Sequence, residues 1–170
     1  DIEYVGEPKL DGLAVEIVYH KGKFVYGSTR GDGVIGEDVT SNLKTIKAIP
    51  LSIKAEKFPN ILEIRGEVFI NKDDFEQLNK ERLKEGLSVF ANARNCAAGS
   101  LRQLNPSITA NRPLRIFCYS PGKIEGVKIK TQKEFLDHLP KWGFPVNDNI
   151  KIGRGASFLD GYYSEISGKR

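Results

Sequence analysis

Glu7-Pro8-Lys9-Leu10-Asp11-Gly12 leads directly into Leu13-Ala14-Val15-Glu16-Ile17-Val18-Tyr19, a run in which apolar side chains recur at every second position. Such spacing is typical of a β-strand with one buried face, and a second run of this kind covers residues 23–29. Lys21-Gly22, between the two runs, predicts a tight turn. The sequence therefore predicts a β-hairpin, with Lys9 at the edge of its first strand.

Lys9 and Asp11 are the first candidates for chemistry. In an extended segment, residues two apart point to the same side of the backbone, so we expect the amine and the carboxylate to face one pocket. Gly12 has no Cβ and would let the chain approach a ligand closely. An amine nucleophile beside a carboxylate indicates covalent chemistry on a phosphate. An exposed Lys–Asp pair before a strand is the alternative that this short motif leaves open.

Helices and strands interleave along the rest of the chain. Arg30–Gly36 is a glycine-rich loop that permits close approach to a ligand, and a strand over Leu62–Ile70 precedes a helix with Asn71 as its N-cap. Further helices are predicted over residues 37–46, 94–103, 132–139 and 157–166, and a further strand over residues 114–119. Because no regular strand–helix–strand repeat occurs, the predicted fold class is α+β, with largely antiparallel sheets flanked by helices.

Length and composition fit one domain. The chain has 170 residues and 39% hydrophobic content, which is enough for a core of its own. It contains no Met, no apolar signal segment and no apolar run of membrane-spanning length, so we expect a piece of a larger protein with no membrane partner. Cys96 and Cys118 are far apart and lack Cys-x-x-Cys spacing, which favours neither a zinc site nor a disulfide framework. These features fit a reducing cytoplasm.

Charge is distributed unevenly, although the net charge of +4 is too small to indicate a partner. Residues 86–124 contain no Asp or Glu but five cations: Arg94, Arg102, Arg112, Arg115 and Lys123. On a helix, Arg94 and Arg102 would stand about 12 Å apart along the axis and about 80° apart around it. They would thus reach different phosphates of one polyanion. A solvated basic face, balanced by acids elsewhere in the fold, is the alternative.

Four sequence blocks, in this order, closely resemble the adenylation domain of bacterial NAD-dependent DNA ligases. The blocks are Glu7–Gly12, Thr29–Gly33, Glu63–Phe69 and Val89–Leu104. The resemblance covers nearly the whole chain. The stretch Phe90-Ala91-Asn92-Ala93-Arg94-Asn95 sets it apart from ATP-dependent DNA ligases and capping enzymes, which share only the Lys-x-Asp-Gly core.

The resemblance implies a nucleotidyltransferase fold in which Lys9 attacks the adenylyl phosphorus of NAD, releases nicotinamide mononucleotide and holds AMP as a phosphoramidate. AMP then passes to the 5′-phosphate of nicked double-stranded DNA, and the neighbouring 3′-hydroxyl displaces it. Mg²⁺ or Mn²⁺ would serve as Lewis acid, through protein ligands that the sequence does not identify. The resemblance further implies the remaining domains of the same ligase as partners, a monomer as the full enzyme and the bacterial cytoplasm as its location.

Individual residues receive roles by the same resemblance. Glu7 is expected near the adenine, Asp11 in the nucleotide pocket, Arg30 and Glu67 at the ribose and phosphate, Tyr119 stacked on the base, and Arg94 and Arg102 towards the DNA nick. Without the resemblance, Glu67 would be interpreted as an edge-strand acid, Tyr119 as a core aromatic and Arg30 as a loop cation.

Two parts of the family's machinery are not expected within residues 1–170. These are the N-terminal helical subdomain that recognises the nicotinamide half of NAD and the later strands that carry further lysines. We therefore expect residues 1–170 to be an adenylation domain that is incomplete on its C-terminal side. Two other functions stay open: a non-catalytic nucleotide- or nucleic-acid-binding module, and an RNA ligase or capping-type transferase that uses ATP or GTP.

Overall fold

The computed structural model describes residues 2–31, 33 and 35–168. Its larger sheet has four strands in the order β3-β2-β4-β5: β2 (Leu13–His20), β3 (Lys23–Thr29), β4 (Ile61–Phe69) and β5 (Arg115–Glu125). Each pair of neighbouring strands in this sheet is antiparallel. Lys21 and Gly22 join β2 to β3 with positive φ angles of 48° and 73°, which match the twist of a tight hairpin. The predicted hairpin is confirmed.

One face of this sheet carries the hydrophobic core. Val15, Ile17 and Tyr19 alternate along β2 and are at most 2% exposed. Helix α5 (Gln132–His138) and the 3-10 turn η1 (Pro140–Trp142) cover this face. The segment from α5 through η1 adds Phe135, Leu136, Leu139, Trp142 and Phe144 to the same cluster. Burial of these large apolar side chains is the main stabilising contribution to the domain.

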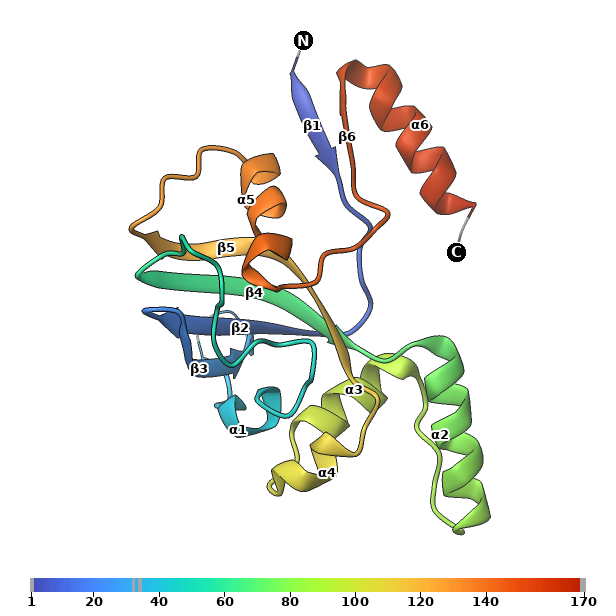
Figure 1. The fold of residues 1–170 in the computed structure, drawn as a ribbon. Coiled ribbons are helices and arrows are strands. Elements are labelled where there is room, and N and C mark those ends of the chain that lie inside the picture. The colour runs from blue at the N-terminus through green and yellow to red at the C-terminus, as the bar shows by residue number, and fades with distance from the viewer. Residues whose placement is uncertain (1, 32, 34, 169–170) are drawn as a thin grey trace.

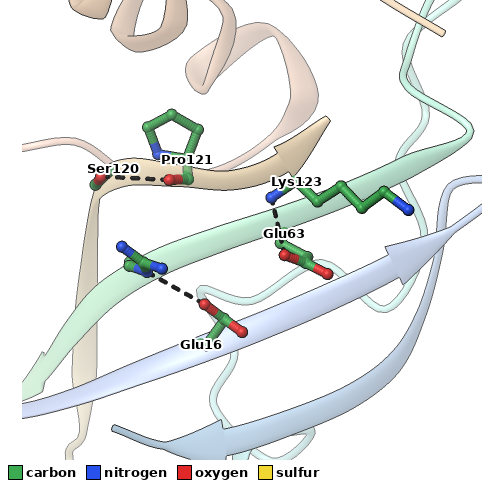
Figure 2. A network of polar contacts seen from close by, with 6 residues as sticks. Glu16, Glu63, Ser120, Pro121 and Lys123 are labelled. Atoms are coloured by element: carbon green, nitrogen blue, oxygen red, sulfur yellow. Dashed lines mark hydrogen bonds and ion pairs between the residues drawn. The ribbon is translucent and has the colours of Figure 1, made fainter. Parts of the chain in front are cut away.

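The opposite face of the same sheet is polar. Glu16 and Arg65 are opposite each other in the β2–β4 register and form an ion pair at 3.2 Å. Glu63 accepts a hydrogen bond from the backbone N–H of Lys123 at 2.8 Å. Figure 2 shows these pairs lying across β2, β4 and β5. Charged groups of this kind keep the face hydrated, so it remains accessible.

A second, two-stranded sheet joins the early and late parts of the described chain. Strand β1 (Glu3–Gly6) pairs antiparallel with β6 (Lys151–Arg154), and helix α6 (Gly155–Ser167) follows β6 directly. Figure 1 shows this unit beside the N-terminus, with α6 against the strands. The helix predicted over residues 157–166 is confirmed. Neither strand is predicted from the sequence, because each has only four residues and its partner lies at the far end of the chain.

Three helices pack together below the larger sheet in Figure 1: α2 (Lys72–Lys84), α3 (Ala93–Leu101) and α4 (Pro106–Ala110). Ile70, Leu78 and Cys96 form a small buried cluster there, separate from the main core. The helices predicted after Asn71 and from residue 94 are confirmed, whereas α4 is not predicted. Asn71 occupies the N-cap position as predicted, although its side chain makes no capping hydrogen bond.

Two predicted elements differ in length from the observed ones. Helix α1 (Thr40–Leu43) is much shorter than the predicted 37–46. Glu37 instead exchanges hydrogen bonds with Thr29 at the end of β3, so a helix begins only after this pair. Strand β5 continues past the predicted end at residue 119 and through Pro121, which an edge strand tolerates because one side of its backbone needs no partner. In the described ranges, no helix is long and apolar enough to cross a lipid bilayer.

Candidate active site

Lys9 lies in the connection between β1 and β2, outside both strands, and close packing fixes the two ends of this loop. At one end, a Cβ on Gly6 would lie 2.7 Å from the Tyr162 ring of α6. At the other end, a Cβ on Gly12 would lie 2.3 Å from the carbonyl oxygen of Val68 in β4. Gly12 therefore allows the loop to approach β4 closely. The side chain of Lys9 itself is exposed.

Two adjoining hollows meet at this lysine. The first has a volume of about 310 Å³ and the second of about 460 Å³, and Lys9, Glu67 and Tyr119 line both. The remaining walls of the first are Glu7, Pro8, Leu10, Phe117, Cys118, Asn147 and Ile150. Those of the second are Leu13, Ala14, Arg30, Gly31, Arg94 and Arg102. The first hollow thus offers aromatic and apolar surface, and the second offers cations.

Glu67 is the carboxylate where the two hollows join. It lies on the central strand β4 and is only 9% exposed. Burial raises the pKa of Glu67, while the cation of Arg94, the backbone N–H of Gly12 and the cation of Lys9 act in the opposite direction. These three groups stabilise the ionised carboxylate in a place that otherwise disfavours charge.

Three arginines reach the second hollow from separate positions of the chain. Arg30 follows β3, Arg94 lies in the first turn of α3, and Arg102 follows the end of α3. Arg94 pairs with Asp11 at 3.5 Å, and Arg102 pairs with Glu37 at 2.6 Å. The side chains of these pairs are 46–78% exposed, and exposed pairs contribute only about 0–1 kcal/mol. A phosphate could therefore replace either carboxylate at small cost.

Asp11 does not share a pocket with Lys9, contrary to the prediction. It lines neither hollow, its side chain is 78% exposed, and its carboxylate pairs with Arg94 at the rim of the second hollow. Asp11 therefore influences the site through Arg94 and through its charge near Glu67.

Glu7 and Tyr119 are linked by Gln132, the first residue of α5. Its Nε2 donates to Glu7 Oε1 at 2.9 Å and to the backbone carbonyl of Tyr119 at 2.6 Å. Burial raises the pKa of Glu7, and the hydrogen bond from Gln132 opposes this shift. Burial also raises the pKa of Tyr119, as does the nearby carboxylate of Glu67. Sequence reasoning missed Gln132 because a single glutamine at a helix start carries no signal of a site.

A third hollow, of about 360 Å³, continues over the polar face of the larger sheet. It shares Arg30 and Tyr119 with the second hollow and is bordered by Glu16, Arg65 and Ser120. These three residues are neighbours in the registers of β2, β4 and β5, and Figure 2 labels Glu16 and Ser120 among them. The three hollows adjoin through shared lining residues, from an aromatic end through a cluster of cations to a polar surface.

An exposed lysine between an aromatic hollow and a hollow lined by cations is an arrangement suited to a nucleotide and its phosphates. All of residues 1–170 match the family model of the NAD-dependent DNA ligase adenylation domain. The chain belongs to this family. The resemblance carried by the four sequence blocks is thereby confirmed, and the chain is an enzyme domain.

Curated relatives of this adenylation domain are bacterial DNA ligases. The DNA ligase of Geotalea daltonii is 54% identical over 170 residues, and that of Geobacter sulfurreducens is 52% identical over 170 residues. The DNA ligase of Pseudomonas aeruginosa is 47% identical over the same length. All of the chain is covered in each comparison, but only 25%, 25% and 21% of the respective relatives. The chain thus spans about a quarter of the length of these ligases.

Most of the residues singled out by sequence meet in this adenylation domain. Glu7, Lys9, Arg30, Glu67 and Tyr119 line the joined hollows. Arg94 and Arg102, which were expected towards the DNA nick, line the second hollow together with Lys9.

Proposed function

We propose that this domain has the nucleotidyltransferase fold and transfers AMP from NAD to Lys9. In this step the neutral amine of Lys9 attacks the adenylyl phosphorus, a P–N bond forms, and the P–O bond to nicotinamide mononucleotide breaks. The amine proton is released, and the electron pair leaves with the mononucleotide. The observation that carries the proposal is the position of Lys9 at the junction of the aromatic and the cationic hollow.

The two hollows suggest how the nucleotide is oriented. The adenine would occupy the first hollow against the Tyr119 ring, because stacking on an aromatic side chain suits any planar base. The phosphate would lie in the second hollow near Arg30, where a guanidinium binds phosphate oxygens through paired hydrogen bonds. Glu67, between the two, would accept hydrogen bonds from the ribose hydroxyls. The phosphorus would then lie beside the Lys9 amine.

A divalent cation, Mg²⁺ or Mn²⁺, belongs to the same proposal. The described residues include no group of three or more His, Cys, Asp or Glu that could hold a metal ion. Magnesium often binds through one or two carboxylates together with substrate phosphates, and Glu67 is the carboxylate that lines both hollows. When bound, the ion would supply Lewis-acid polarisation of the transferring phosphate.

We further propose that the complete protein seals nicks in double-stranded DNA. AMP would pass from Lys9 to the 5′-phosphate of the nick, and the 3′-hydroxyl would then displace AMP and close the strand. Arg94 and Arg102 support this order of events, because they border the hollow that would hold the AMP phosphate. Their exposed carboxylate partners would give way to the incoming 5′-phosphate.

The experiment is intact-mass measurement of the full-length protein after incubation with NAD and Mg²⁺. The wild type should gain one AMP, and neither ATP nor GTP should replace NAD. Lys9→Ala and Lys9→Arg should gain nothing, since alanine has no amine and a guanidinium stays protonated. Lys9→Ala should still seal DNA that already carries AMP on its 5′-phosphate. Lys80→Ala, at an exposed position of α2, is the matched control and should behave as the wild type.

Covalent AMP on the Lys9→Ala protein would contradict the assignment of the nucleophile. Covalent AMP from ATP, or covalent GMP from GTP, on the wild type would favour a different class of nucleotidyltransferase. Failure of the wild type to gain a nucleotide from any of the three would favour a non-catalytic binding module.

A further inference from the structure

Gln132 joins two residues that line the first hollow. Its half-buried carboxamide donates from Nε2 to Glu7 Oε1 at 2.9 Å and to the backbone carbonyl of Tyr119 at 2.6 Å. A carboxamide nitrogen has two hydrogens, so these bonds use its whole donor capacity. An ionised carboxylate and a carbonyl both only accept, which fixes the orientation of the amide. Gln132 therefore connects the loop that carries Lys9 to strand β5.

Helix α5 holds this glutamine in place. The side chain of Thr131 caps the helix by accepting a hydrogen bond from the backbone N–H of Glu134 at 3.1 Å. Phe135 and Leu136, in the next turn, are at most 6% exposed and belong to the main core. A capped and anchored first turn leaves the Gln132 backbone little freedom. Gln132 therefore holds the carboxylate of Glu7 at a fixed position relative to the core.

We propose that Gln132 is a positioning residue for adenine recognition, holding one oxygen of Glu7 so that the other accepts a hydrogen bond from the adenine 6-amino group. The inference rests on the proposed function, in which the base of AMP occupies the first hollow. An amino group only donates and a carboxylate only accepts, so the two are complementary. Hypoxanthine carries a carbonyl oxygen at the same position, and an ionised Glu7 repels it.

The ionised form of Glu7 requires support because the carboxylate is half-buried. Burial raises the pKa of Glu7, and the Gln132 hydrogen bond acts against this. The other ionisable groups facing it come from its own loop, β4, β5 and α6: Lys9, Glu67, Cys118, Tyr119 and Tyr162. Burial raises the pKa of Cys118 to about 12 and also raises that of Tyr119, so both are neutral near neutral pH. Loss of Gln132 therefore favours a protonated Glu7, which donates where it should accept.

The test uses the full-length ligase that contains this domain. Gln132→Leu and Gln132→Glu remove the donor while keeping a side chain of similar size. Gln77→Leu is the matched control, because Gln77 lies on the exposed side of α2 and its amide bonds Glu81. Binding of AMP and of IMP is measured by calorimetry from weakly acidic to neutral pH, together with the Tm of each variant and the covalent AMP formed from NAD.

Gln132→Leu should weaken AMP binding about tenfold to a hundredfold, the range expected for losing a hydrogen bond to a charged group. It should not weaken IMP binding, because a protonated Glu7 can donate to the hypoxanthine carbonyl. Its AMP affinity should also begin to fall at a higher pH than that of the wild type as the solution is acidified. In Gln132→Glu, the AMP affinity should begin to fall at a still higher pH, since a second carboxylate beside Glu7 disfavours ionisation of Glu7. Gln77→Leu should alter neither affinity nor pH dependence.

Unchanged AMP binding in Gln132→Leu overturns the inference. So does an equal loss of AMP and IMP binding, with or without a fall in Tm, because a structural role alone does not distinguish the bases. A wild type that shows the AMP preference and its dependence on Gln132, yet never gains AMP on Lys9, supports the inference and contradicts the proposed function. A wild type that binds neither nucleotide overturns both.

Discussion

Gly12 separates the Lys9 loop from β2, and the carbonyl of Val68 occupies the space that a Cβ would need. We expect Gly12→Ala to lower the free energy of unfolding by about 1–3 kcal/mol, because the backbone of β4 must shift to relieve the overlap. Gly161→Ala on α6 is the control, since nothing lies within 4 Å of its added Cβ, and it should stabilise the helix by about 0.5–1 kcal/mol. Urea unfolding of the 170-residue chain measures both. Equal losses in the two variants would show that contact with Val68 is not the cause.

Glu67 carries a charge where burial disfavours it. A carboxyl whose pKa is raised by folding stabilises the fold while protonated, and this contribution is lost as pH rises through the folded-state pKa. The neutral variant Glu67→Gln should therefore melt at a higher temperature than the wild type near neutral pH. This advantage should shrink as pH falls towards about 4, the ordinary pKa of a glutamate. Differential scanning calorimetry across this range is the measurement, and a Tm difference that does not vary with pH would contradict the assignment.

Among the helices, α3 presents Arg94 from its first turn and is followed directly by Arg102, and both line the second hollow. Replacing either with Ala should weaken binding of nicked DNA and reduce the slope of log affinity against log salt by about one charge. Arg102→Ala should slow adenylation of Lys9 less than it weakens binding of nicked DNA. Arg94→Ala should also slow adenylation at low pH, because the cation of Arg94 helps to keep Glu67 ionised.

Binding by fluorescence anisotropy at several salt concentrations, with single-turnover adenylation in parallel, separates these effects. Arg82→Ala is a suitable control, since Arg82 lies on α2 over the Phe90 ring, outside the hollows. A salt slope that is unchanged in both α3 variants would exclude them as phosphate contacts.

The hairpin and β4 are predictable from sequence because their apolar alternation is local. Strands β1 and β6 are not, since each is a four-residue segment whose partner lies at the other end of the chain. The length of helix α1 is overestimated because Glu37 forms hydrogen bonds with Thr29 at the end of β3. A helical sequence pattern does not reveal this pairing. At the site, Lys9 and Glu67 are found through their motifs. Gln132 acts only through tertiary contacts with Glu7 and Tyr119, so it has no local signature.

At the scale of the whole molecule, the described residues form two hydrophobic clusters, and each contains one buried cysteine. Cys118 lies in the main cluster, and Cys96 lies in the small cluster beneath α2 and α3. Burial raises the pKa of both thiols, that of Cys118 to about 12. Reaction with a thiol reagent therefore requires an opening that hydrates the sulfur.

Cys96 should react faster than Cys118 under native conditions, because a cluster of three buried residues opens more easily than the main core. Cys118 should react only at the rate of global unfolding. Mass spectrometry of the Cys96→Ala and Cys118→Ala proteins during labelling with iodoacetamide follows each thiol alone. Identical rates for the two thiols would mean that both clusters open as one unit.

The β1–β6 pairing also has a consequence for the order in which the protein is made. Strand β1 leaves the ribosome near the start of the domain, whereas β6 emerges only after the strands of the larger sheet. The four-stranded sheet can close over its core while β1 still lacks the partner that anchors the Lys9 loop. A nascent chain therefore acquires a folded interior before the Lys9 loop is anchored at both ends. On the proposed function, it should not be able to take AMP from NAD before residue 154 has cleared the exit tunnel.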